Sequence, residues 1–162
     1  MRICILGATG LTGNELLTLI DRAWPGADLA LFASRTREVE RHGKTLSIRA
    51  ATDLETEDAP RGDVAFVALD DDHSKRYVPR LLELGYRVID KSNTYRMDPE
   101  VVLGVAGVNH NRVTDATRLV ANPNCTRSTR RPQARRSSFA SRGKEVRFVQ
   151  VSEQRAQYGR SK

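Results

Sequence analysis

Residues 2–13 read RICILGATGLTG, an apolar run followed by a turn with three evenly spaced glycines. The run at residues 2–6 is typical of a buried strand, and residues 14–22 carry Leu and Ile at helical spacing until Pro25-Gly26. In such a unit the glycines permit close backbone approach, and the first turn of the helix offers N–H groups to a pyrophosphate. The stretch therefore predicts a dinucleotide cradle, against the alternative of a tight turn that binds nothing. The candidate cofactor-binding residues of this turn are Gly7, Thr9, Gly10, Leu11, Thr12 and Gly13.

Downstream of this unit, apolar runs alternate with a helical pattern. We expect strands at residues 28–34, 63–69 and 86–90, a short edge strand at 45–50, a polar loop at 35–44 and a helix at 74–84 that ends before Gly85. Residues 101–108 continue the apolar pattern, and residues 119–121 lead toward Cys125. The alternation predicts an α/β fold with a Rossmann-like, doubly wound parallel sheet, incomplete in this chain and followed by a disordered basic tail.

The net charge of +7 is concentrated at one end of the chain. Residues 126–162 hold eleven Lys and Arg against two Glu, whereas residues 1–125 hold sixteen Lys and Arg against eighteen Asp and Glu. The basic character therefore says nothing about partners of the folded part. Residues 127–142, rich in Arg and Ser, are typical of disorder, and only residues 145–152 show a strand pattern beyond Cys125. An Arg-rich arm can bind nucleic acid, but few aromatic residues are interleaved with it, so nucleic acid is not the partner we expect.

Cys4 and Cys125 are the only cysteines of the chain. Cys4 lies in the first apolar run, where a free cysteine fills the role of a small buried side chain. Neither cysteine has metal-ligand spacing, and we expect no metal and no disulfide. The sequence has no stretch of roughly 20 apolar residues and no room for a signal peptide, so we expect a cytoplasmic protein without a membrane span.

Ser34, Arg35 and Thr36 lie where the second expected strand ends and the following loop begins. An NAD site usually presents Asp or Glu to the ribose hydroxyls about 20 residues beyond the glycine-rich turn. Here a guanidinium and two hydroxyls stand in that place, and the planar fork of Arg suits a 2′-phosphate. These three residues therefore favour NADP over NAD as the cofactor. The alternative is that Arg35 only caps a solvated loop.

Four motifs together resemble the aspartate-semialdehyde dehydrogenase family. They are GATGLTG at residues 7–13, ASR at residues 33–35 with Gly43-Lys44, VIDKSNTYRMD at residues 88–98, and ANPNC at residues 121–125. The resemblance covers residues 1–126. N-acetyl-γ-glutamyl-phosphate reductase is a related family with a similar glycine-rich loop and a catalytic cysteine, but the third and fourth motifs favour the first family.

The resemblance implies reduction of β-aspartyl phosphate to aspartate semialdehyde by NADPH through a thioacyl enzyme. Cys125 matches the nucleophile of the family, which attacks the acyl phosphate, and the thioester then accepts a hydride. Arg96 matches the arginine that holds the substrate phosphate, and Asn124 is placed to hydrogen-bond near the reacting carbonyl. The alternatives are an inert buried thiol at Cys125 and a surface salt bridge at Arg96.

The chain also departs from the pattern of the family. Lys91 stands where the family usually has Asn, and Ala106-Gly107 replaces a Pro-Glu pair. The resemblance implies a second domain with a catalytic His and most of the homo-oligomer interface, and we expect that domain to be absent from this chain. We therefore divide the chain into a dinucleotide-binding domain at residues 1–126 and an anomalous tail at 127–162. Two hypotheses would explain the sequence of this tail. One is a pair of reading-frame disturbances, near codons 126 and 153, and the other is an evolved basic tail.

His42, His73 and His110 all precede Cys125, and none is a convincing catalytic base. Without a base, Cys125 lacks a partner that would lower the pKa of its thiol. We therefore expect a member of the dehydrogenase family that is inactive as this chain. The alternatives are a non-catalytic NADP-binding remnant and a fragment of the related reductase.

Overall fold

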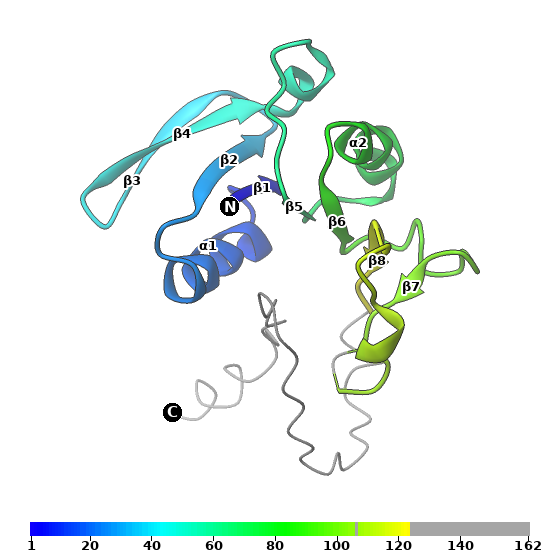
Figure 1. Cartoon of the computed structure of the whole chain (residues 1–162). Coiled ribbons are helices and arrows are strands. Elements are labelled where there is room, and N and C mark those ends of the chain that lie inside the picture. The colour runs from blue at the N-terminus through cyan, green and yellow to red at the C-terminus, as the bar shows by residue number, and fades with distance from the viewer. Residues whose placement is uncertain (106, 124–162) are drawn as a thin grey trace, which may run out of the picture.

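The structure, a computed structural model, describes residues 1–105 and 107–123. The expected tail and its strand pattern at 145–152 therefore lie outside the described residues. The described part is built around one eight-stranded sheet with the strand order β3-β4-β2-β1-β5-β6-β8-β7 (Figure 1). Its strands are β1 (Arg2–Leu6), β2 (Asp28–Ala33), β3 (Arg37–Arg41), β4 (Lys44–Ala50), β5 (Val64–Val67), β6 (Arg87–Asp90), β7 (Val102–Leu103) and β8 (Leu119–Ala121).

Neighbouring strands run parallel everywhere except in the hairpin of β3 and β4. The Rossmann-like α/β architecture expected from the sequence is confirmed, with one antiparallel strand added at an edge. The helices are α1 (Leu11–Ala23) and α2 (Asp71–Glu83), with short 3-10 turns η1 (Ala51–Glu55) and η2 (His110–Arg112). Neither α-helix in the described part of the chain is long and apolar enough to cross a membrane.

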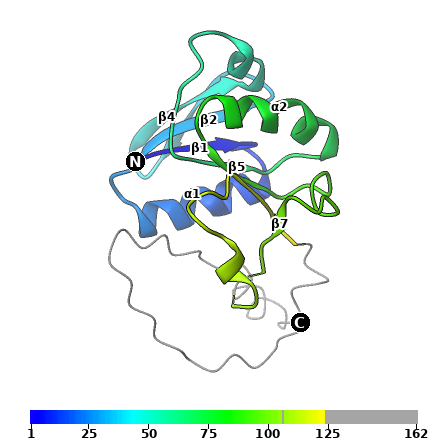
Figure 2. The same ribbon diagram turned by 45° about the vertical axis from the view of Figure 1, so that its right-hand side comes forward.

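The two α-helices cover opposite faces of the sheet (Figure 2). Side chains alternate along a strand, and in β1 Ile3 and Ile5 pack with α1 while Cys4 and Leu6 belong to the cluster of α2. Because β1 is central and covered on both faces, all four of these residues are apolar and buried. Cys4 is fully buried, which confirms the expected core role of that residue, and burial raises the pKa of its thiol.

The polar segment at residues 35–44 is not a loop, and that prediction was wrong. It contains β3, which pairs antiparallel with β4 through the two-residue turn His42-Gly43. Both turn residues have positive φ, 50° and 72°, as the tightest hairpin turns require. As a result β3 forms the edge of the sheet, and the segment expected as an edge strand lies one position inside it.

Both α-helices begin three residues earlier than the apolar pattern predicted, at Leu11 and Asp71. Periodicity shows only the part of a helix that is packed, whereas the first turn of each helix reaches beyond the core. At the other end the prediction holds: Leu84 caps α2, and Gly85 follows with φ 95°. The apolar pattern at 101–108 yields only the short strand β7.

Candidate functional site

The strand order reverses direction at β1, which lies between β2 and β5. In open parallel sheets, ligands bind outside the carboxyl ends of the strands at such a switch point. The residues that follow β1, β2, β5 and β6 therefore define the candidate site. They include every candidate cofactor residue of the sequence, because these residues follow β1 and β2 directly.

The backbone of the glycine-rich turn lies directly against the backbone of neighbouring segments. The amides of Gly7 and Ala8 both donate to the carbonyl of Phe32, at 2.9 Å. Gly7 has φ 94°, and a Cβ there would lie 2.9 Å from the carbonyl oxygen of Ala68. A Cβ on Gly13 would lie 2.7 Å from the Cα of Ala8. Glycine at these two positions lets α1 start immediately beside the end of β1.

The N-terminus of α1 is open. The first hydrogen bond of the helix joins the amide of Asn14 to the carbonyl of Gly10 at 3.0 Å, so the amides of residues 11–13 have no acceptor within the helix. The cap residue is Gly10, which has no side chain to satisfy them, and the first turn carries no acidic residue. Uncapped amides and the positive end of the helix dipole suit an anion such as a pyrophosphate.

The N-terminus of α2, at the same edge of the sheet, is closed by contrast. Asp70 caps it by accepting a hydrogen bond from the amide of His73 at 3.0 Å, and Asp71 and Asp72 fill its first turn. Hydrogen bonds from the backbone and the side chain of His73 lower the pKa of Asp70. The negative charge of these aspartates repels a phosphate from the N-terminus of α2. An anion is therefore expected to bind at the N-terminus of α1 instead.

Ser34, Arg35 and Thr36 follow β2, and all three are exposed. The hydroxyl of Thr36 accepts a hydrogen bond from the amide of Ala50 at 3.1 Å, which ties this turn to β4. Within residues 1–105 and 107–123, the side chains of Ser34 and Arg35 make no hydrogen bond or ion pair with one another or with their neighbours. They are open to a ligand, whereas Thr36 is partly used by the fold.

A buried carboxylate shapes the end of β6. Asp90 is fully buried and accepts hydrogen bonds from the hydroxyl of Ser74 at 2.9 Å and from the amide and hydroxyl of Ser92. These bonds connect the turn after β6 to α2. Burial, followed by the negative charge of Asp90, raises the pKa of the nearby Tyr95 phenol.

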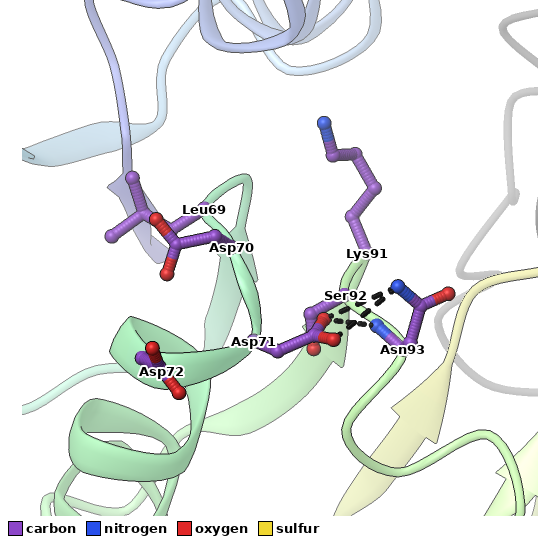
Figure 3. A pocket seen from close by; sticks show the side chains of 7 residues that line it. All are labelled: Leu69, Asp70, Asp71, Asp72, Lys91, Ser92 and Asn93. Atoms are coloured by element: carbon purple, nitrogen blue, oxygen red, sulfur yellow. Dashed lines mark hydrogen bonds between the residues drawn. The ribbon is translucent and has the colours of Figure 1, made fainter.

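An open pocket of about 380 Å³ lies between the ends of β5 and β6 (Figure 3). It is lined by Leu69, Asp70, Asp71, Asp72, Lys91, Ser92 and Asn93. Asp71 accepts a hydrogen bond from the amide of Asn93 at 2.7 Å, which joins the two loops. The Lys91 side chain extends away from this contact, and its Nζ donates to the hydroxyl of Thr12 on α1 at 3.3 Å.

The Arg96 guanidinium donates hydrogen bonds to three neutral acceptors. Its Nε donates to the carbonyl of Asn122 at 2.9 Å, and its two terminal nitrogens donate to the side-chain oxygen of Asn93 and the carbonyl of Lys91. The surface salt bridge considered as the alternative role of Arg96 does not occur among the described residues. The guanidinium is thus held at the end of β8, with a positive charge that no described carboxylate within 4.0 Å neutralises.

Asn124 and Cys125 lie outside the described residues. The chain leading to them is anchored on both sides of Asn122, because its amide donates to the carbonyl of Asp90 at 2.7 Å and its carbonyl accepts from Arg96. Arg96 therefore contacts the chain three residues before Cys125. The three histidines lie elsewhere, His42 in the β3–β4 turn, His73 on α2 and His110 in η2. No group of three or more metal-binding side chains occurs in the part of the chain that the structure describes.

Asp90 and Lys91 are site residues that the sequence-based prediction did not select. The segment containing them was assigned to a strand end, and residues directly after a central parallel strand lie at the ligand edge of the sheet. Lys91 directly follows β6, so its place in the sequence after a central strand is the signal that indicates a residue of the candidate site.

Known proteins resemble this chain over most of its described part. A family model described as "Semialdehyde dehydrogenase, NAD binding domain" matches residues 2–116. The aspartate-semialdehyde dehydrogenase of Aquifex aeolicus is 36% identical over 132 residues, which cover 77% of this chain and 38% of that protein. The N-acetyl-gamma-glutamyl-phosphate reductase of Methanocella arvoryzae is 36% identical over 148 residues, which cover 77% of this chain and 43% of that protein.

A solved structure agrees with these sequence matches. The crystal structure of aspartate semialdehyde dehydrogenase II from Vibrio cholerae, complexed with ASA, is similar with a TM-score of 0.68 and 28% sequence identity. The match covers 78% of this chain and 42% of that one. The chain thus spans about two fifths of the length of the proteins it resembles.

Proposed function

Because this chain belongs to the semialdehyde dehydrogenase family, we propose that it binds NADP at the carboxyl edge of its sheet. The observation that carries the proposal is the open N-terminus of α1 behind Gly7 and Gly13. The free amides of residues 11–13 would receive the pyrophosphate, and the exposed Leu11 and the Thr9 backbone border the same turn. When bound, the nicotinamide would supply or accept a hydride.

The choice of NADP rests on the turn after β2. Arg35 and Ser34 are exposed and free of partners among the described residues, and residues 34–36 contain no carboxylate. A guanidinium binds a 2′-phosphate through two parallel hydrogen bonds, whereas a free ribose diol offers it no charge. Thr36 has its acceptor engaged with Ala50 but can still donate its hydroxyl proton.

The reaction to which we propose these site residues belong is that of the family, reduction of an acyl phosphate to a semialdehyde, although we expect no turnover from this chain alone. Cys125 would attack the acyl carbon and release phosphate, and Asn124 would hydrogen-bond to the carbonyl oxygen. Two N–H groups of the Arg96 guanidinium remain for an anion after its three bonds to the protein. Aspartyl phosphate is the substrate we propose first, and N-acetyl-γ-glutamyl phosphate is the second candidate, because a relative carries that name.

Binding is tested by titrating the 162-residue chain with NADPH and with NADH. We expect NADPH to bind more tightly, and Arg35→Ala to reduce NADPH affinity about tenfold, as the loss of a charge-assisted contact predicts. NADH, which lacks the 2′-phosphate, is the internal control, and its affinity should not change. Equal loss for both ligands would contradict a 2′-phosphate role for Arg35, and no binding of either would contradict the proposed site.

Catalysis is tested separately, by NADPH formation from NADP, inorganic phosphate and aspartate semialdehyde. None of the three histidines belongs to the described segments that contain Arg96 and Asn122, and we infer that this part of the chain supplies no histidine as general base there. We therefore expect the chain to bind NADP without turning over. Turnover that disappears in Cys125→Ser would overturn this expectation and identify the chain as an active enzyme. If turnover occurs, the same assay with N-acetylglutamate semialdehyde distinguishes the second candidate.

A further inference from the structure

We propose that Lys91 supplies a positive charge to the cofactor pyrophosphate from the β6 side of the switch point. The proposal rests on the proposed NADP site and adds to it a residue from a different strand end. Arg35 follows β2 and Lys91 follows β6, so the two cations flank the glycine-rich turn after β1 from opposite sides of the sheet order. The cofactor would then be held by one cation at its 2′-phosphate and by another at its pyrophosphate.

The position of Lys91 is fixed by its backbone. Its amide donates to the carbonyl of Val67 in β5 at 3.0 Å, and its carbonyl accepts a hydrogen bond from Arg96. Its side chain passes over the end of β5, which separates β6 from β1, and its Nζ lies 3.3 Å from the hydroxyl oxygen of Thr12. Thr12 belongs to the first turn of α1, whose amides are open. The ammonium therefore lies beside the anion site.

The charge of Lys91 is available, although three aspartates line the same pocket. Each aspartate has another partner: Asp70 accepts from His73 at 2.8 Å, Asp71 accepts from Asn93 at 2.7 Å, and Asp72 lies 3.9 Å from Lys75. Among the described residues, no carboxylate lies within 4.0 Å of the Lys91 Nζ. Figure 3 shows the side chain directed away from Asp71 and Asp72.

The ammonium also has hydrogen-bonding capacity to spare. A lysine carries three N–H donors, and Thr12 accepts one of them. Two donors remain for phosphate oxygens, next to amides that favour the same negative group. The contact with Thr12 thus holds Lys91 in place before the ligand arrives, which reduces the entropy lost on binding.

The test uses the full chain and four proteins: wild type, Lys91→Met, Lys91→Arg and Arg22→Gln. Met has nearly the length of Lys without its charge, Arg keeps the charge, and Arg22 is an exposed cation at the other end of α1. We expect Lys91→Met to weaken NADPH binding about tenfold, the loss typical of one charge-assisted contact. Lys91→Arg should restore most of the affinity, and Arg22→Gln should bind as wild type does.

Adenosine 2′-monophosphate separates the pyrophosphate from the rest of the ligand. It contains the 2′-phosphate but no pyrophosphate, so its affinity should be the same in all four proteins. Circular dichroism checks that each variant folds. Equal NADPH affinity of wild type and Lys91→Met, or an equal loss for adenosine 2′-monophosphate, would overturn the role of Lys91 and leave the NADP site standing. Failure of the wild-type chain to bind NADPH would instead overturn the proposed function, and this inference with it.

Discussion

At the scale of single residues, Gly10 and Gly13 of the first turn have different physical roles. A Cβ at Gly13 would lie 2.7 Å from the Ala8 Cα and 2.8 Å from the Ala8 carbonyl carbon, and neither atom can rotate away. At Gly10 the nearest atom would be 3.4 Å away, and φ there is −74°, which any residue adopts. Gly13 is therefore required for the close approach of α1 to the end of β1, whereas Gly10 is not.

We predict that Gly13→Ala destabilises the fold by about 1–3 kcal/mol, the usual cost of overpacking, and abolishes NADPH binding by displacing α1. Gly10→Ala is the matched control and should cost about 1 kcal/mol or less, because it changes only a cap position. Urea denaturation of the two variants measures the difference. Equal destabilisation would show that the spacing between α1 and β1 adjusts more freely than the distances indicate.

Some residues of the candidate site could be predicted from the sequence, and others could not. The glycines, Ser34 and Arg35 were selected from local spacing, because a turn and its ligand contacts are encoded within a few positions. Asp90 and Lys91 form hydrogen bonds with Ser74 and Thr12, which are 16 and 79 positions away. Contacts of that range depend on the strand order, and local patterns do not specify it. The roles of Cys125, Asn124 and Arg96 stay predictions from the resemblance.

At the scale of elements, α2 depends on its cap. The folded-state pKa of Asp70 is lowered below its ordinary value of 3.8, first by the amide of His73 and then by its side chain. A carboxyl with a lowered pKa stabilises the fold above its unfolded pKa and loses that contribution as pH falls through the folded value. We therefore predict that stability declines below about pH 4, and less steeply in Asp70→Asn, since Asn caps a helix without titrating. Thermal melts at several pH values test this, and parallel curves for both proteins would contradict it.

The hairpin of β3 and β4 explains the main error in predicting the elements. Residues 37–41 read REVER, and a single apolar side chain gives no alternating pattern. Such polarity suits an edge strand, because exposed charges discourage pairing with other molecules. The informative signal was the turn itself, since His42-Gly43 takes the positive φ values of a two-residue hairpin. Central strands were easier to predict because burial on both faces makes them apolar.

At the scale of the whole molecule, the apolar clusters and the net positive charge belong to different parts of the chain. Among the described residues, both apolar clusters are built from residues no later in the chain than Leu119. The sixteen Lys and Arg of residues 1–123 are outnumbered by eighteen Asp and Glu, so the net charge of +7 comes from the rest of the chain. Stability and overall charge should therefore be separable by a single truncation.

We predict that a chain ending at residue 123 melts within a few degrees of the full chain and binds NADPH with similar affinity, because it keeps both clusters and the open end of α1. Its net charge becomes slightly negative, so it should bind an anion-exchange column that the full chain passes through. The full chain, measured at the same salt concentration, is the control. A markedly lower melting temperature would mean that residues 124–162 pack against the sheet. An unchanged melting temperature together with weaker NADPH binding would mean that the positive charge of these residues, and not their packing, strengthens NADPH binding. In that case the difference in affinity should disappear at high salt.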